Sequence, residues 1–210
     1  MRKLLVIAGL AMAVSANAEG IEFWAVFGQT LVSNAGLGSD LCPSGSSNTL
    51  CSSFGGTSND VSLADGFHFG FRGGFNTGDH LGYEMSYMYN RTTLQQNQPP
   101  GSANLGGMAY HQVEFNALYY FTPIDAKIRP FVTGGVGFTN YAPPGTSGAS
   151  GGGSTKLGID YGGGVKIKLT QKFGLRVDVR QATTPKPLGL PLASGWLRET
   201  EFSAGVGYYF

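Results

Sequence analysis

Charged residues, cysteines and long apolar runs are all scarce in this sequence. Only 14 Lys and Arg and 13 Asp and Glu occur among 210 residues, with a formal net charge of +1, so no basic excess indicates a nucleic-acid partner. No window shows sustained helical periodicity. The apolar run near the N-terminus has about 11 residues, against the roughly 20 that a membrane-spanning helix needs. A nucleic-acid-binding protein and a helical membrane protein are therefore disfavoured.

The N-terminal apolar run belongs to an export-signal pattern. Two cations, Arg2 and Lys3, precede it, and the small-x-small sequence Ala16-Asn17-Ala18 follows it. We predict that residues 1–18 are a signal peptide, cleaved between Ala18 and Glu19, which leaves residues 19–210 as one domain. A single transmembrane anchor is the alternative, but the run is short for a span.

The chain has two cysteines, Cys42 and Cys51, in the stretch "CPSGSSNTLC". In an exported protein, two cysteines this close and separated by turn residues are most simply explained by a disulfide that closes a small loop. Metal binding and free thiols are the alternatives. Metal binding would need further ligands, and no His, Asp or Glu lies between the two cysteines.

Glycine and aromatic residues, in contrast, are abundant, with 34 Gly, 14 Phe and 10 Tyr. Aperiodic glycine can accompany disorder, but this many aromatic side chains favour an ordered fold. Apolar and polar residues alternate with a period of two in several segments. In "GFHFGFRGGF", residues 66–75, the phenylalanines share one face, and His68 and Arg72 share the other with glycines. This pattern is typical of β-strands with one apolar face.

Eight segments carry this pattern, and the connections between them alternate in length. Short connections lie at 76–80, 122–127 and 170–172, and long ones near 31–65, 92–107, 142–155 and 184–196. An even number of strands with all long loops at one end is the layout of an up-and-down membrane barrel. Closure lets the first strand pair with the last, so no edge stays open. We predict an all-β fold, an eight-stranded antiparallel up-and-down transmembrane β-barrel, with strands within 21–29, 66–75, 81–90, 112–121, 129–141, 157–169, 175–180 and 199–210.

Alternation alone does not distinguish a membrane barrel from a soluble barrel such as a lipocalin, which turns its apolar face inward. The polar face decides between them. It is rich in glycine, as in "LGIDYGGGVKIK" (157–168), which suits the narrow interior of an eight-stranded barrel better than a solvated exterior. Aromatic residues on an outer face suit lipid and would be an aggregation hazard in water.

Charged residues on the polar face are predicted to form a salt-bridge network inside the barrel, because buried charges must be paired to offset their desolvation. Arg72 and Glu84 are symmetric about Gly78 and are expected to lie opposite each other. Lys166 should oppose Arg176, with a diagonal acid to compensate. A gated ion path through the lumen is the alternative to a polar plug. The predicted network comprises Arg72, Glu84, Glu114, Asp160, Lys166, Arg176, Asp178, Arg180 and Glu201.

The segments "IRPFVTGGVGFTNY" (128–141), "LGIDYGGGVKIKLTQKFGLRVDVR" (157–180) and "EFSAGVGYYF" (201–210) resemble the small outer-membrane β-barrels of Gram-negative bacteria, the OmpA-like and OmpX-like eight-stranded barrels. The resemblance covers the mature chain. It implies the cell outer membrane as the location and insertion by the outer-membrane assembly machinery. The longer OmpA type carries a peptidoglycan-binding domain after the barrel, and this sequence shows none, so tethering to the cell wall is not expected.

The same resemblance implies that the closing segment is a C-terminal assembly signal. Such signals alternate apolar residues and end in an aromatic, here Phe202, Val206, Tyr208 and Phe210. Normal assembly of a chain lacking Phe210 would contradict that role.

Some outer-membrane barrels of this size modify lipid A or phospholipids, so we searched for a Ser/His group. His80 lies in a short turn, His68 faces the predicted lumen, and His111 lies on the lipid face in a stretch without serine. We therefore predict a protein that is not an enzyme, with no catalytic residues, cofactor or metal site.

The expected role is structural, or that of a platform whose long loops contact an extracellular ligand. A narrow passive channel is the alternative, and lipid modification comes third. The expected partners are outer-membrane lipid, lipopolysaccharide and the assembly machinery, and the barrel is expected to be a monomer because a closed barrel satisfies its own backbone.

Overall fold

The computed structural model describes residues 19–33, 35–39, 60–98, 101–142, 154–188 and 195–210. Within these ranges no helix is long and apolar enough to cross a membrane. The described strands are β1 (Glu19–Ser33), β2 (Gly36–Ser39), β3 (Asp60–Leu63), β4 (Gly66–Asn76), β5 (Leu81–Gln98), β6 (Gly101–Tyr120), β7 (Ile128–Ala142), β8 (Ser154–Lys168), β9 (Phe173–Pro185) and β10 (Trp196–Tyr209).

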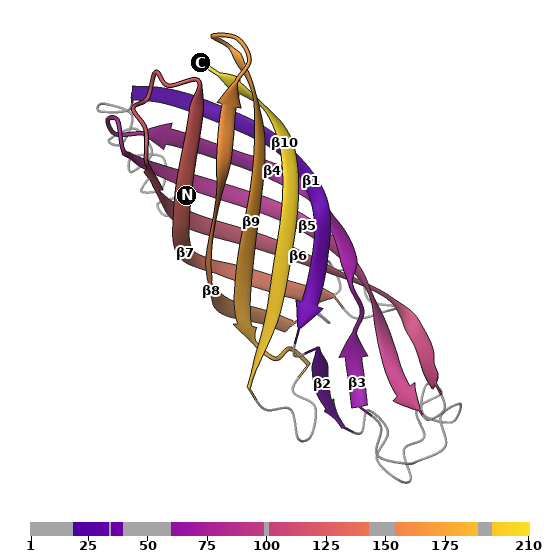
Figure 1. Cartoon of the computed structure of the whole chain (residues 1–210). Coiled ribbons are helices and arrows are strands. Elements are labelled where there is room, and N and C mark those ends of the chain that lie inside the picture. Colours follow the sequence, from indigo (N-terminus) through magenta and orange to yellow (C-terminus); the bar gives the residue numbers. More distant parts are fainter. Residues whose placement is uncertain (1–18, 34, 40–59, 99–100, 143–153, 189–194) are drawn as a thin grey trace, which may run out of the picture.

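Eight of these strands close into a barrel in the order β1-β4-β5-β6-β7-β8-β9-β10, with every neighbouring pair antiparallel (Figure 1). The seam joins the first strand to the last, from Glu22 opposite Tyr209 to Ser33 opposite Arg198. The wall has no open edge, so its backbone groups bond within the protein, as a lipid environment requires. The predicted eight-stranded antiparallel barrel is confirmed.

The two ends of the barrel differ. Short connections at 77–80, 121–127 and 169–172 lie at one end together with the start of β1 and the end of β10, and we call this the turn end. The opposite end, from which the long loops leave, is the loop end. Both named ends lie at the extremes of the tilted strands in Figure 1.

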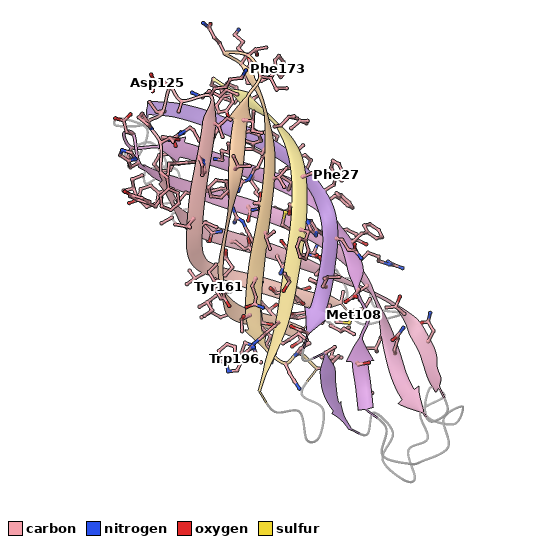
Figure 2. The ribbon with its side chains drawn as sticks, viewed as in Figure 1. Phe27, Met108, Asp125, Tyr161, Phe173 and Trp196 are labelled. Carbon is pink, nitrogen blue, oxygen red and sulfur yellow. The ribbon has the colours of Figure 1, made fainter. Side chains whose placement is uncertain are left out.

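The alternating pattern places aromatic and aliphatic side chains outside the barrel and charged ones inside it. Phe27 is 65% exposed and points away from the wall in Figure 2, and Val206 is 59% exposed. Arg72 and Trp24, on the inner face, are fully buried. An apolar exterior with a polar interior is the arrangement of a membrane barrel and the reverse of a soluble one.

Close packing of the interior depends on glycine at specific positions. A Cβ on Gly207 would overlap the indole ring of Trp24, which fills the lumen beside it. A Cβ on Gly73, which lies on the outer face, would meet nothing within 4 Å. The glycine-rich polar face therefore makes room for large buried side chains, and the outer glycine has no such role.

The structure corrects the predicted loops at 31–65 and 92–107. β2 and β3 lie within the first, and β5 and β6 continue through the second to Gln98 and from Gly101. The sequence there, "TTLQQNQ" on β5, lacks apolar alternation on its outer face. Strands that extend beyond the membrane face water on that side, so the lipid-facing pattern used for prediction ends before the strand does.

The register of the β4–β5 hairpin is shifted from the expected symmetry about Gly78, but Arg72 and Glu84 still form an ion pair, at 3.7 Å. Arg72 lies opposite Ser86, and Glu84 lies opposite Gly74, two positions from the expected pairing. The turn is centred on Asp79 instead of Gly78, since Asn76 pairs with Gly82. Lys166 does lie opposite Arg176 as predicted. Cys42 and Cys51, with the predicted signal peptide, lie outside the described residues.

We predict that Gly207→Ala lowers the free energy of unfolding by roughly 1–3 kcal/mol, the usual cost of overpacking a filled core, because the new methyl group meets the Trp24 ring. Gly73→Ala is the matched control and should change it by less than about 0.5 kcal/mol. Urea unfolding of the barrel in lipid vesicles measures both. Equal effects of the two substitutions would contradict the packed interior.

Candidate functional site

The lumen is filled by buried side chains arranged in layers along the barrel axis. At the turn end, Lys166 forms an ion pair with Glu22 and lies 2.6 Å from the hydroxyl of Tyr120. Its ammonium group also lies 5.5 Å from the ring centroids of Trp24 and of Phe131. This layer neutralises a buried cation with one carboxylate and a set of aromatic faces.

Arg129 completes the turn-end layer. Its guanidinium group stacks 3.7 Å above the Tyr120 ring and donates to the backbone carbonyl of Asp79 at 2.9 Å. The arginine therefore closes the lumen floor against the β4–β5 turn.

The central layer joins three arginines to two acids. Arg176 donates from Nε to Asp178 at 2.6 Å and also pairs with Glu84. Arg180 donates to Glu84 at 2.5 Å, and Arg72 lies 3.2 Å from Asp178. All five side chains are buried. Each charge has at least two opposite charges within ion-pair distance, which offsets much of the cost of removing it from water.

The next layer toward the loop end is acidic. It consists of Glu114, Asp160, Glu199 and Glu201, all buried. The side chain of Arg180 extends toward the loop end and comes within 3.8 Å of Glu114 and 3.9 Å of Asp160. Arg72 comes within 3.9 Å of Glu201. These contacts are longer than those of the central layer, so the acidic layer is only weakly compensated.

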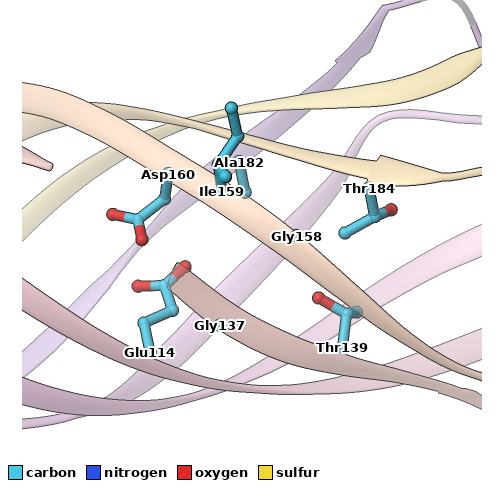
Figure 3. Close-up of a pocket in the computed structure, with 8 residues that line it drawn as sticks. All are labelled: Glu114, Gly137, Thr139, Gly158, Ile159, Asp160, Ala182 and Thr184. Carbon is cyan, nitrogen blue, oxygen red and sulfur yellow. The ribbon is translucent and has the colours of Figure 1, made fainter. Parts of the chain in front are cut away.

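A small cavity lies in the acidic layer, between β6, β7, β8 and β9. Its volume is about 10 Å³, which is room for about one water molecule. Gly137 and Gly158 leave part of its wall without side chains, and Figure 3 shows the carboxyl groups of Glu114 and Asp160 pointing toward each other at one side. Among the described residues, this space is too small for an open path through the barrel.

An apolar cluster covers the lumen at the loop end, and we call it the apolar cap. Its members come from the barrel mouth and from the strands that extend beyond it, and they are buried against one another. An ion crossing the barrel would have to pass this cluster, in which the only side-chain polar groups are the hydroxyls of Tyr110 and Tyr141. The apolar cap comprises Leu37, Val61, Leu63, Leu94, Met108, Tyr110, Tyr141 and Leu197.

All nine residues of the predicted charge network lie in the lumen and are buried. The expected compensation of Lys166 by Asp178 is replaced by the pair with Glu22. Sequence reasoning missed Glu22, Arg129 and Glu199, although each has the inward parity of its strand. Extending the parity count to the ends of the strands would have found all three.

A serine–histidine pair that the sequence search did not find is present in the lumen. His68 Nε2 lies 2.9 Å from Ser203 Oγ, and Nδ1 lies 2.9 Å from Thr30 Oγ1. No acid orients the imidazole in this arrangement, and His68 is only 1% exposed, so a lipid substrate has no access to it. His111, on the outer face, bonds to the hydroxyl of Tyr87. Within the described chain no group of His, Cys, Asp and Glu side chains could hold a metal ion.

A second candidate site lies outside the membrane wall. β4 stops pairing with β5 at Arg91, and β7 stops pairing with β6 at Ala109. Beyond these points β5 and β6 pair with each other, from Thr92 opposite Met108 to Gln98 opposite Gly101. β3 pairs with β5 through Val61 opposite Gln96, and β2 pairs with β3. The result is a four-stranded sheet in the order β2-β3-β5-β6, which we call the projecting sheet (Figure 1).

The sequence matches a known protein family. The family model described as the outer membrane protein beta-barrel domain matches residues 4–210. The chain belongs to this family. Membership indicates the Gram-negative outer membrane.

Solved structures of small outer-membrane barrels share the fold. Neisserial surface protein A has a TM-score of 0.57 and 18% sequence identity, over 92% of this chain and 99% of that chain. OprG from Pseudomonas aeruginosa has a TM-score of 0.59 and 15% identity, over 92% and 97%. Comparison with curated proteins finds no match. At these identities the neighbours show the fold alone.

We predict that Glu84→Ala lowers the free energy of unfolding in lipid vesicles by roughly 3–5 kcal/mol, because it leaves Arg72, Arg176 and Arg180 with too few buried partners. Asp125→Asn, in the exposed turn between β6 and β7, is the control and should have an effect below about 0.5 kcal/mol. A similar, small effect of both substitutions would show that the ion pairs do not hold the lumen together.

Proposed function

We propose that this protein is a non-enzymatic component of the outer membrane, in which a sealed barrel anchors an extracellular interaction platform. The platform is the projecting sheet. The protein is exported by a signal peptide that is cleaved after Ala18. The outer-membrane assembly machinery then inserts it and recognises its closing strand.

The observation that carries the proposal is the continuity of β5 and β6 beyond the barrel. Residues 92–98 of β5 extend past the last pairing with β4, which at about 3.3 Å per residue adds roughly 20 Å of strand. From the β1–β4 connection, β3 pairs with this extension, and β2 pairs in turn with β3. A loop that served only to connect strands would need none of this ordered structure.

The two faces of the projecting sheet differ in a way that suits a platform. Leu63 and Leu94 are buried in the apolar cap, whereas Thr93 and Gln95 lie on the other face and are partly exposed. The inner face therefore fixes the sheet to the barrel mouth. The outer face and the free edge of β6 over residues 101–108, which has no strand beside it within the described chain, are available to a partner.

The filled lumen favours a role as a platform and disfavours a role as a channel. Arg72, Arg176 and Arg180 cross the centre with almost no exposure, and the apolar cap lies above them. A passive channel needs a continuous polar path, and the cavity beside Glu114 and Asp160 has room for only about 10 Å³.

The test compares the full chain with a trimmed variant in which residues 95–104 are replaced by an Asn-Gly turn. We expect cells producing the full chain to bind one or more of a panel of immobilised extracellular proteins and polysaccharides, and cells producing the trimmed chain to lose that binding.

A second experiment measures conductance. Both purified barrels, and the Arg72→Ala/Glu84→Ala variant, should leave the conductance of a planar bilayer at its value without protein.

Heat-dependent gel mobility controls for the folding of each variant. Discrete conductance steps from the full chain would contradict the sealed lumen. Equal binding by full and trimmed barrels would contradict the projecting sheet as the platform.

A further inference from the structure

The buried charges of the lumen do not balance. Seven buried acids face five buried cations, an excess of two negative charges, and the excess is not evenly spread. All five cations start from the turn-end and central layers, together with Glu22, Glu84 and Asp178. Among the described residues, buried cations reach the four acids of the loop-side layer, Glu114, Asp160, Glu199 and Glu201, only at 3.8–3.9 Å, from Arg180 to Glu114 and Asp160 and from Arg72 to Glu201.

The hydrogen bonds to Glu114, Asp160 and Glu199 come from neutral donors. Ser86 donates to Glu114 at 2.9 Å, and Asn116 donates to Asp160 at 2.8 Å. Gln112 and Tyr141 each donate to Glu199 at 3.1 Å. Buried carboxylates that carry full charge are usually held by cations, as Glu84 is held by Arg176 and Arg180.

Glu201 shows the imbalance most clearly. Its side chain is 1% exposed, and neither of its carboxyl oxygens has a hydrogen-bond partner in the described chain. Thr30 lies opposite Glu201 on one neighbouring strand and Arg180 on the other. Arg180, however, donates its hydrogen bond to Glu84. Asp160 also has one oxygen, Oδ1, without a partner, and it lines the cavity. An unpartnered carboxylate in such a place is costly, and a proton removes its charge.

We propose that the folded barrel binds protons at this carboxyl cluster at neutral pH, and that Glu201 is held as a carboxylic acid. Two protons cancel the excess charge. The carboxyl groups of Glu114 and Asp160 point toward each other across the cavity in Figure 3, which lets an acid and a carboxylate share a hydrogen bond. A proton needs no more room than the cavity provides, and no set of ligands for a metal ion is present among the described residues.

The groups that surround the cluster set its protonation. No charged side chain from β1 or β5 faces it within the described residues, and those strands contribute Thr30, Ser86 and Asn90. The titratable and charged groups that face it are Arg72 and His68 on β4, Tyr110 and Glu114 on β6, Tyr141 on β7, Lys156 and Asp160 on β8, Asp178 and Arg180 on β9, and Glu199 and Glu201 on β10.

Infrared spectroscopy of the complete barrel in lipid vesicles tests the proposal, because a protonated carboxyl group has a carbonyl stretch distinct from that of a carboxylate. We expect this band at pH 7 in the wild type and a clear loss of its intensity in Glu201→Gln. Asp125→Asn is the control, because Asp125 lies in the exposed turn between β6 and β7, outside the lumen. It should leave the band unchanged.

Stability gives a second readout. A neutral amide in place of a neutral acid should change the folding equilibrium constant of Glu201→Gln by less than about tenfold, whereas Glu84→Gln should lower it by about a hundredfold or more. If Glu201→Gln does not assemble, the same band is measured in Glu199→Gln, which also removes one negative charge from the cluster and should therefore lower the band.

Three results would overturn the proposal. The first is the absence of a protonated-carboxyl band from the wild type at pH 7. The second is a band that Glu201→Gln, or Glu199→Gln in its place, leaves intact. The third is a barrel whose stability falls about tenfold or more when sodium is replaced by choline, because a metal cation would then be balancing the charge.

Discussion

Ion pairing inside a lipid-facing wall is the interaction on which the rest of this structure depends. The outer surface of the barrel is apolar and the interior is too narrow for bulk water, so each inward charge must find its partner within the protein. The short pairs that Arg176 and Arg180 of β9 make with Glu84 of β5 meet this requirement across the lumen, and Asp178 adds a pair within β9. They thereby hold opposite sides of the wall together. The apolar cap and the projecting sheet continue the structure beyond the membrane.

Filling the lumen has a consequence for where the protein can act. With the centre occupied by arginines and the mouth covered by the apolar cap, the interior serves stability, and the accessible chemistry lies on the projecting sheet. The loop-side carboxyl groups are the exception. They lie between the ion pairs of the central layer and the apolar cap, and the arginines reach them only through contacts of 3.8–3.9 Å.

The barrel itself was predictable from the sequence, because a wall between lipid and a crowded interior imposes a strict two-residue alternation and glycine on the inner face. The inward residues Arg72 and Glu201 followed from parity alone. The pairing of Lys166 with Glu22 did not, since it joins strands that are distant in sequence. The projecting sheet was missed because strands above the membrane face water, and a polar stretch such as 92–98 then carries no alternating signal. Its register depends on pairing between β3 and β5, which local patterns do not specify.

The most direct measurement concerns which face of the wall meets lipid, and the two tryptophans of the chain make it possible. Trp24 is fully buried in the lumen, and Phe27, on the same strand, is 65% exposed on the outer face. In vesicles of brominated lipid, we predict strong fluorescence quenching of a Trp24→Phe/Phe27→Trp/Trp196→Phe variant and little quenching of Trp24 in a Trp196→Phe variant. Strong quenching of Trp24 with little effect at position 27 would mean that the barrel is inverted, and would contradict the charged, sealed lumen described above.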